Sequence, residues 1–306
     1  METLGMTAHA NVATQGDRAR SRARRGNTLA KGFLTILGLT NIALVGLICV
    51  YLITAGLPAI EKIGLADFLL GTTWASTAKP PQFGILPFIL TSLYGMFGAL
   101  ILSLPWGLLV AMYLSSTAGK AHRRFLMPWV DLLASIPSVV YGFLGMLVLV
   151  PAIQTLFDLP DGSGLLASIV VLTVMVLPTI IKVESTAISQ VPEDYRLNSL
   201  ALGANEEETL FRVIVPAARS GIAAAMVLGV GRALGEAMAV MMVAGNAANM
   251  PGLFESVRYL TTAVASEMAY SAGLQREALF SIALVLFVFI MMTNSVLNVL
   301  VKRGMR

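Results

Sequence analysis

The sequence contains six long runs in which no residue is charged. Such runs constrain the fold strongly, because a helix that crosses the hydrocarbon core of a bilayer needs about 20 mostly apolar residues. Only 12% of the residues are charged, against about 25% in a soluble domain. We therefore expect an all-α integral membrane protein with six transmembrane helices. The expected spans are 32 to 55, 85 to 115, 126 to 152, 165 to 183, 218 to 245 and 279 to 301.

Lysine and arginine indicate the orientation of these spans. Most of the 21 basic residues lie in the N-terminal arm, in two loops on the same side and in the C-terminal tail, and basic loops stay in the cytoplasm. We expect both termini to be cytoplasmic. The arm, residues 1 to 30, is polar and Arg-rich and is expected to be disordered. Its charge is read as a topology signal and not as a nucleic-acid site, and residues 31 to 306 form the transmembrane domain.

The fifth expected span carries two charged residues, Arg232 and Glu236. An ionised side chain near the bilayer centre costs about 2.5 to 3.5 kcal/mol on the lenient insertion scale, so such residues usually face other helices or a wet path. A spacing of four places both on one face of a continuous helix. Small residues in rows on either side of that face let helix backbones approach closely. These rows are Gly221, Ala225, Gly229, Ala233 and Ala237 on one side, and Gly231, Gly235 and Ala239 on the other.

Two interpretations of this pair are open. In the first, Arg232 and Glu236 form an ion pair that only fixes the packing of the helix. In the second, the two residues belong to an anion pathway. Arg232 then offers its guanidinium to a passing anion, and Glu236 pairs with Arg232 when no anion is present.

The third expected span contains the stretch S-I-P-S-V-V-Y-G, from Ser135 to Gly142. Pro137 has no backbone N–H, so one backbone carbonyl loses its helical hydrogen bond, and lipid offers that carbonyl no donor. The hydroxyls of Ser135, Ser138 and Tyr141 could satisfy that carbonyl, or they could line an aqueous passage. Both interpretations stay open.

The segment from 183 to 216, here called the 183–216 loop, has a helical period. Pro192 begins a helix, and Gly203 can end it in a left-handed cap. Asn205 followed by Glu208 resembles a capping box that restarts a helix. We expect two short helices joined at a glycine elbow, either folded against the chain's own helices, which is slightly favoured, or docked in a partner's groove. The apolar side chains available for either contact are Leu197, Leu200, Leu202, Leu210, Phe211 and Ile214.

The sequence shows no hydrolytic or metal-binding motif. The only Gly-Lys pair, Gly119 and Lys120, is followed by Ala121, so a phosphate-binding loop of the G-x-x-x-x-G-K-[ST] type is absent. The two histidines, His9 and His122, are isolated. We expect a protein that is not an enzyme and binds no cofactor. If ATP drives its function, another chain must supply the ATPase.

Three stretches together resemble a known family. Ser199 to Pro216 resembles the cytoplasmic loop of type I ABC importer permeases, with Gly203 and Ile214 to Pro216 at matching positions. Leu197, Asn198 and Ser199 stand where that loop has Glu, Ala and Ala. The stretches from Gly231 to Val240 and from Ser135 to Gly142 are similar to PstC-type permease subunits of phosphate ABC importers.

The resemblance implies a MetI-like fold in the inner membrane of a bacterium and a chain that forms half of a phosphate pathway. It also implies a PstA-like second permease subunit, two PstB-like ATPase subunits that hold ATP and Mg²⁺, and a PstS-like phosphate-binding protein outside. Under this reading the pathway residues are Arg232, Glu236, Ser135, Ser138 and Tyr141. The residues of the ATPase-coupling loop are Asn198, Ser199, Leu202, Gly203, Asn205, Glu206 and Pro216.

Two alternatives remain. One arginine cannot distinguish tetrahedral anions, so an importer of sulfate or molybdate fits the same residues. A passive or ion-coupled anion carrier would use Arg232 as its selectivity charge and would need no ATPase.

Overall fold

The computed structural model describes residues 2 to 304, with side chains described for 31 to 119 and 121 to 299. The chain divides into two compact units, residues 1 to 54 and 55 to 306. Helix α1 (Glu2–Ile63) forms the first unit and begins the second. The expectation of disorder concerns residues 1 to 30, whose side chains lie outside the described residues, and it stays a prediction.

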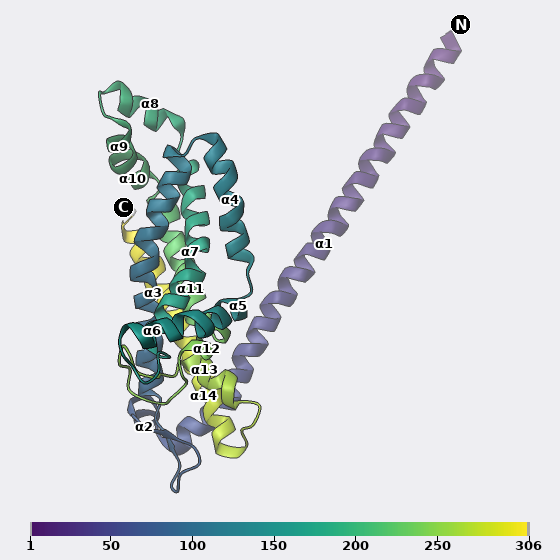
Figure 1. The fold of residues 1–306 in the computed structure, drawn as a ribbon. Coiled ribbons are helices and arrows are strands. Elements are labelled where there is room, and N and C mark those ends of the chain that lie inside the picture. The colour runs from purple at the N-terminus through teal and green to yellow at the C-terminus, as the bar shows by residue number, and fades with distance from the viewer. Residues whose placement is uncertain (1, 305–306) are drawn as a thin grey trace. The chain divides into compact units, whose positions relative to one another are not determined.

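The second unit is helical apart from one two-stranded sheet, in which β1 (Trp74–Ala75) pairs antiparallel with β2 (Gln82–Phe83). Its long helices run alongside one another, and α8, α9 and α10 lie together at one end (Figure 1). The helices of the first half are α2 (Leu65–Leu70), α3 (Leu86–Met112), η1 (Tyr113–Thr117), α4 (Lys120–Ser135), α5 (Ser138–Leu144), η2 (Gly145–Leu149) and α6 (Val150–Leu156). Those of the second half are α7 (Leu165–Ser189), α8 (Glu193–Ala201), α9 (Glu206–Thr209), η3 (Leu210–Ile214), α10 (Val215–Ala217), α11 (Arg219–Gly235), α12 (Met238–Val243), α13 (Leu260–Glu267) and α14 (Gly273–Gly304).

Five helices among the described residues are long and apolar enough to cross a membrane, or six if one bent pair counts as a single span. The expected all-α membrane fold is therefore confirmed. The five are Lys31–Ile63, Leu86–Thr117, Ser138–Leu156, Leu165–Ser189 and Gly273–Val299. The bent pair is Glu206–Ala217 with Arg219–Gly235, which meet at 67°.

Two of the expected spans are not continuous helices. The third, 126 to 152, is broken between α4 and α5, because Ile136 is extended (φ −63°, ψ 130°) before Pro137, as residues before proline tend to be. The fifth, 218 to 245, is broken where α11 ends at Gly235 and α12 begins at Met238. The prediction of one helix was wrong in both places.

The main core lies between the long helices of the second unit. Helix α3 packs along α7, and α11 packs against both. Buried Met96 and Leu100 of α3 meet Leu172, Met175 and Val176 of α7 in one apolar cluster. Because side chains from all three helices are interleaved there, the core holds α11 and the residues it carries in place.

A second apolar cluster lies at the end of the unit away from α8 to α10. Trp74 of β1 packs edge-on against Phe83, with ring centroids 5.3 Å apart, and Phe88 lies 5.6 Å from it. Fully buried Leu260 of α13 and Leu279 of α14 join the same cluster. Val264 of α13 and Met268, which follows α13, pack against this cluster as well.

Candidate functional site

Arg232 lies in the last turn of α11 and is half-buried. Its Nη1 donates a hydrogen bond to Oγ1 of Thr179 on α7, at 3.0 Å. The two helices come close because α11 has glycine on this side: a Cβ on Gly229 would lie 3.1 Å from Cδ1 of Ile180. The close approach lets a threonine hydroxyl partner the guanidinium inside the protein.

Glu236 follows the end of α11 and is in an extended conformation (φ −75°, ψ 128°). Its Oε1 accepts a hydrogen bond from the backbone N–H of Ala239 at 2.9 Å, which satisfies an N–H in the first turn of α12. The hydroxyl of Thr261 donates to the Glu236 carbonyl at 2.8 Å. Both hydrogen bonds stabilise a turn where a continuous helix was expected.

This break changes the relation between the two charges. A spacing of four places residues on one face while the helix continues, and Glu236 is the first residue beyond the end of α11. Among the ion pairs of the described residues, these two side chains do not form one. In this conformation Arg232 is held by Thr179 and Glu236 by α12.

The two rows of small residues differ in what they contact. In the first row, a Cβ on Gly221 would lie only 2.2 Å from Cβ of Ala187 on α7, and Ala225 is fully buried. In the second row, a Cβ on Gly231 or Gly235 would meet nothing within 4 Å. The first row is thus a helix-packing seam, as predicted, whereas the two glycines of the second row face open space in this chain.

The hydroxyls around Pro137 satisfy carbonyls of α4. The carbonyl that Pro137 frees is that of Leu133, four residues earlier, and the Tyr141 hydroxyl donates to it at 2.7 Å. Ser135 donates to the Leu132 carbonyl, also at 2.7 Å. Ser138 begins α5 and is half-buried. Of the two interpretations, carbonyl satisfaction is what Ser135 and Tyr141 do in this structure.

The two helix breaks are brought together by α5 and α12. A Cβ on Gly142 of α5 would lie 2.7 Å from Cα of Ala239 and 2.8 Å from its carbonyl oxygen. Backbones this close leave no room for a side chain. The turn that contains Glu236 and the turn that contains Pro137 therefore lead into two helices in direct backbone contact.

The 183–216 loop folds as the sequence predicts. Gly203 has a left-handed φ of 91° after α8. The Asn205 side chain accepts from the Glu208 N–H at 2.7 Å, and the Glu208 carboxylate accepts from the Asn205 N–H at 3.2 Å. This reciprocal pair is a complete capping box at the start of α9.

Helices α8 and α9 are also joined across the elbow. Arg196 donates two hydrogen bonds to Glu206, at 2.8 and 3.0 Å, and these bonds hold the pKa of the Glu206 carboxyl below its usual value. The hydroxyls of Ser199 and Thr209 lie 2.9 Å apart. Two side-chain links on successive turns make α8 and α9 one folded unit.

Apart from half-buried Leu200, the apolar side chains named in the 183–216 loop divide into two groups. Leu210 and Ile214 are buried against Ala111 and Met112 of α3. Leu197, Phe211 and Leu202 are exposed, and Leu202 is 90% exposed. The loop thus packs on its own chain through one group and leaves the other group exposed. Asn198 and Pro216 are exposed as well.

Two residues at this site were not singled out from the sequence. Thr179 follows Pro178 in the fourth expected span, and a polar residue beside a proline was a usable signal. Thr261 lies 25 residues from Glu236, and nothing local indicates that contact. Among the described residues, no group of three His, Cys, Asp or Glu side chains could hold a metal ion.

Comparison with known proteins decides the family. The model of the family described as "Binding-protein-dependent transport system inner membrane component" matches residues 103 to 306. This chain belongs to that family. The all-α fold, the membrane spans and the resemblance to importer permeases are all in agreement with membership.

Curated members of the permease family align with most of the chain. The probable ABC transporter permease protein YqgH of Bacillus subtilis (strain 168) is 38% identical over 264 residues, which cover 83% of this chain and 84% of that protein. The phosphate transport system permease protein PstC of Haemophilus influenzae is 32% identical over 281 residues, which cover 85% and 88%. PstC 2 of Mycobacterium tuberculosis is 29% identical over 296 residues, which cover 89% and 91%.

Solved structures of ABC transporters share the fold. A bacterial alginate ABC transporter matches with a TM-score of 0.60 at 16% identity, covering 92% of this chain and 96% of that chain. The inward-facing MetNI methionine transporter matches with a TM-score of 0.54 at 19% identity, covering 73% and 95%. The expected MetI-like permease fold is confirmed.

Proposed function

We propose that this chain is the PstC-type permease subunit of an ATP-driven phosphate importer and forms half of its alternating-access pathway. The observation that carries the proposal is the alignment with PstC proteins over nearly the whole chain. The alignment includes the fifth span, where a half-buried arginine provides a planar group with several N–H donors that suits an oxyanion.

The partners follow from the family and from the exposed half of the 183–216 loop. The importer would contain a PstA-like second permease subunit, two PstB-like ATPase subunits and a PstS-like phosphate-binding protein outside. ATP and Mg²⁺ would be held by the ATPase subunits. Exposed Leu202, beside the Gly203 elbow, is the apolar side chain that would enter a groove on the ATPase. The other residues of the contact would be Asn198, Ser199, Asn205, Glu206 and Pro216.

The orientation follows from charge. Most of the basic residues lie in the N-terminal arm, in the loop around Lys120, in and beside the 183–216 loop and in the C-terminal tail, and such segments stay on the cytoplasmic side of the bacterial inner membrane. The loop then faces the ATPases, and α2, α13 and the small sheet face outward. Both termini are cytoplasmic.

Arg232 would bind the passing phosphate weakly. In this structure its guanidinium is partnered by the neutral hydroxyl of Thr179, which occupies donors without cancelling the charge. A phosphate that displaces Thr179 gains a charge-assisted bond. The loss of the Thr179 bond offsets part of that gain, so affinity stays low and release remains possible.

The test uses the complete importer, purified with its copurifying ATPase and second permease and supplied with the binding protein. Arg232→Gln should assemble normally and abolish phosphate uptake per assembled importer, because it removes the charge and keeps a polar side chain. Arg232→Lys is the matched control and should retain part of the uptake. Thr179→Val should retain uptake, since Thr179 is only the resting partner.

Four outcomes would contradict the proposal. Full uptake by Arg232→Gln would remove the arginine from the pathway. Full uptake by the exchanged pair, Arg232→Glu with Glu236→Arg, would leave only a packing role. Phosphate uptake by this chain without any ATPase subunit would indicate a passive or ion-coupled carrier, and retention of sulfate or molybdate by the copurifying binding protein would indicate another oxyanion.

A further inference from the structure

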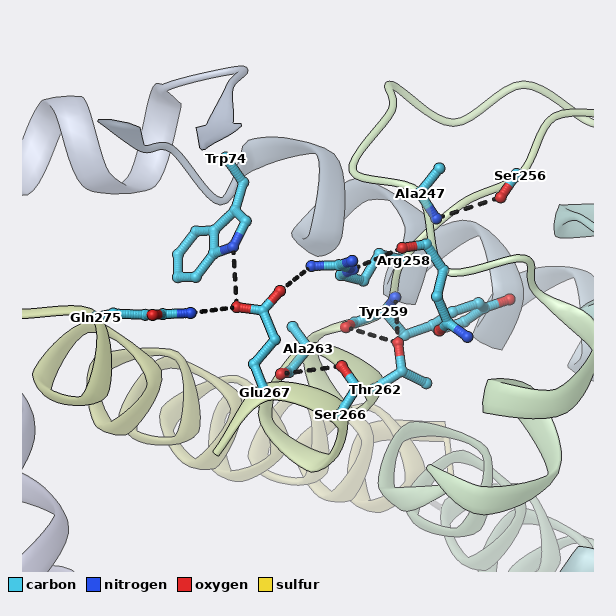
Figure 2. Close-up of polar contacts among 11 residues, drawn as sticks. Trp74, Ala247, Ser256, Arg258, Tyr259, Thr262, Ala263, Ser266, Glu267 and Gln275 are labelled. Atoms are coloured by element: carbon cyan, nitrogen blue, oxygen red, sulfur yellow. Dashed lines mark hydrogen bonds and ion pairs between the residues drawn. The ribbon is translucent and has the colours of Figure 1, made fainter. Parts of the chain in front are cut away.

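Four side chains form a polar cluster around Glu267, the last residue of α13 (Figure 2). Its Oε2 accepts hydrogen bonds from Nε1 of Trp74 at 3.3 Å and from Nε2 of Gln275 at 3.0 Å. Its Oε1 accepts from Nη1 of Arg258. We call Trp74, Arg258, Glu267 and Gln275 the Glu267 cluster. It joins β1, the segment before α13, α13 itself and the start of α14.

The ion pair in this cluster is mostly buried. The Arg258 side chain is 17% exposed and that of Glu267 is 21% exposed, and the guanidinium also lies 5.8 Å from the centre of the Phe88 ring. Loss of one partner of a buried pair strongly destabilises a fold, because the other charge is left unpaired. The pair therefore anchors α13 firmly to the surrounding segments.

The segment just before α13 holds one end of α12. Nε of Arg258 donates to the carbonyl of Asn246 at 2.8 Å, and the N–H of Val257 donates to the carbonyl of Ala244 at 2.9 Å. The Asn246 side chain in turn donates to the Met241 carbonyl within α12 at 2.7 Å. The C-terminal end of α12 is thereby tied to Arg258.

The first turn of α13 holds the other end of α12. Thr261 is 9% exposed and donates to the Glu236 carbonyl at 2.8 Å, just before α12 begins. The turn that carries Thr261 is itself fixed, because the Leu260 N–H donates to Ser92 of α3 at 3.1 Å and Tyr259 is packed against Gly95 of α3. Helix α12 is clamped between Arg258 and Thr261.

We propose that Thr261 is a positioning residue of the translocation pathway, which keeps Glu236 extended and the break between α11 and α12 in place next to Arg232. The Glu267 cluster fixes the helix from which Thr261 acts. This inference rests on the proposed phosphate transport. It assigns no contact between Thr261 and the anion.

The experiment compares Thr261→Val, which keeps the β-branched shape and loses the donor, with Thr261→Ser, which keeps the donor. In the complete importer, Val should lower the maximal rate of phosphate uptake per assembled importer by roughly tenfold, the size of effect that one lost hydrogen bond can have. The half-saturating phosphate concentration should stay unchanged, and Ser should restore most of the rate. Ser266→Ala is the matched control on α13, because the Ser266 hydroxyl contacts only the carbonyl of Ala263 in its own helix.

Two outcomes would overturn the inference. One is an unchanged uptake rate in Thr261→Val. The other is a fall in the amount of assembled importer with an unchanged rate per importer, which would indicate a structural role only. Failure of the proposed function is distinct from both, since in that case the wild-type importer itself would not take up phosphate.

Discussion

The two helix breaks of the second unit contact each other through α5 and α12, yet they form in different ways. The break at Pro137 comes from one residue that lacks an N–H. The carbonyl of Leu133, which loses its helical donor, accepts a hydrogen bond from the hydroxyl of Tyr141 instead. The break at Glu236 has no proline. It depends on a carboxylate that caps α12 and on a hydroxyl from Thr261, far along the chain.

The difference shows which turns can be read from a membrane sequence. A proline disfavours helix wherever it stands, so the first break is encoded locally. The second break lies beside Gly235, and glycine weakens a helix by only about 0.5 to 1 kcal/mol. It is held in part by Thr261 of α13, so it depends on tertiary structure.

The largest effect is expected at the contact between the two breaks. Gly142→Val should destabilise the purified chain by about 3 kcal/mol, because the new Cβ would meet the backbone of Ala239, which cannot move aside as a side-chain end can. Thermal unfolding in detergent measures the change. Gly231→Ala is the control: its Cβ meets nothing within 4 Å, and alanine should stabilise α11 by about 0.5 to 1 kcal/mol. Equal stability of Gly142→Val and wild type would refute the close contact.

A smaller effect is expected at the Pro137 break. Tyr141→Phe removes the hydroxyl that reaches the Leu133 carbonyl and should destabilise the chain by about 1 kcal/mol, the typical value for one hydrogen bond. The same unfolding measurement applies. If Tyr141→Phe costs nothing, the hydroxyl does not satisfy the carbonyl, and a role in lining the pathway becomes the better explanation.

The smallest expected effect is the energetic coupling between Pro137 and Tyr141 at the first break. Pro137→Ala restores an N–H that can bond the Leu133 carbonyl, so Tyr141→Phe should cost about 0.5 kcal/mol less in the Pro137→Ala background than in the wild type. A double-mutant cycle by thermal unfolding gives this coupling. No such coupling is expected between Pro137→Ala and Thr261→Val, because the second break does not depend on the proline. Strict additivity of Pro137→Ala and Tyr141→Phe would argue against the local origin of the first break.

The parts predicted correctly from the sequence are those encoded by neighbouring residues. The spans near 85 to 115 and 165 to 183 follow from apolar length, and α3 and α7 match them closely. The glycine elbow and the capping box of the 183–216 loop follow from Gly203, Asn205 and Glu208. Each of these signals acts over four residues or fewer, or over a continuous apolar run.

The parts that could not be predicted depend on distant residues. The partner of Arg232 is Thr179, 53 residues away, and the anchors of Glu236 include Thr261 in a separate helix. A helical spacing rule cannot detect either contact, because it assumes that the helix continues. The transport roles of Arg232 and Glu236, of Ser135 and Ser138, and of the exposed loop residues remain predictions.

Because Glu206–Ala217 and Arg219–Gly235 meet at 67°, we expect a movement of the 183–216 loop to tilt α11 and to move Arg232. Gly221, beside the bend, is packed so closely on α7 that an added Cβ would lie 2.2 Å from Cβ of Ala187, whereas an added Cβ on Gly229 would meet side-chain ends of Ile180, Leu100 and Val176 at 3.1 to 3.3 Å. Arg232 lies about 16 Å along α11 from Gly221, at about 1.5 Å per residue. A rotation of α11 by about 10° about Gly221 would therefore displace Arg232 by about 3 Å, which is enough to break its hydrogen bond to Thr179.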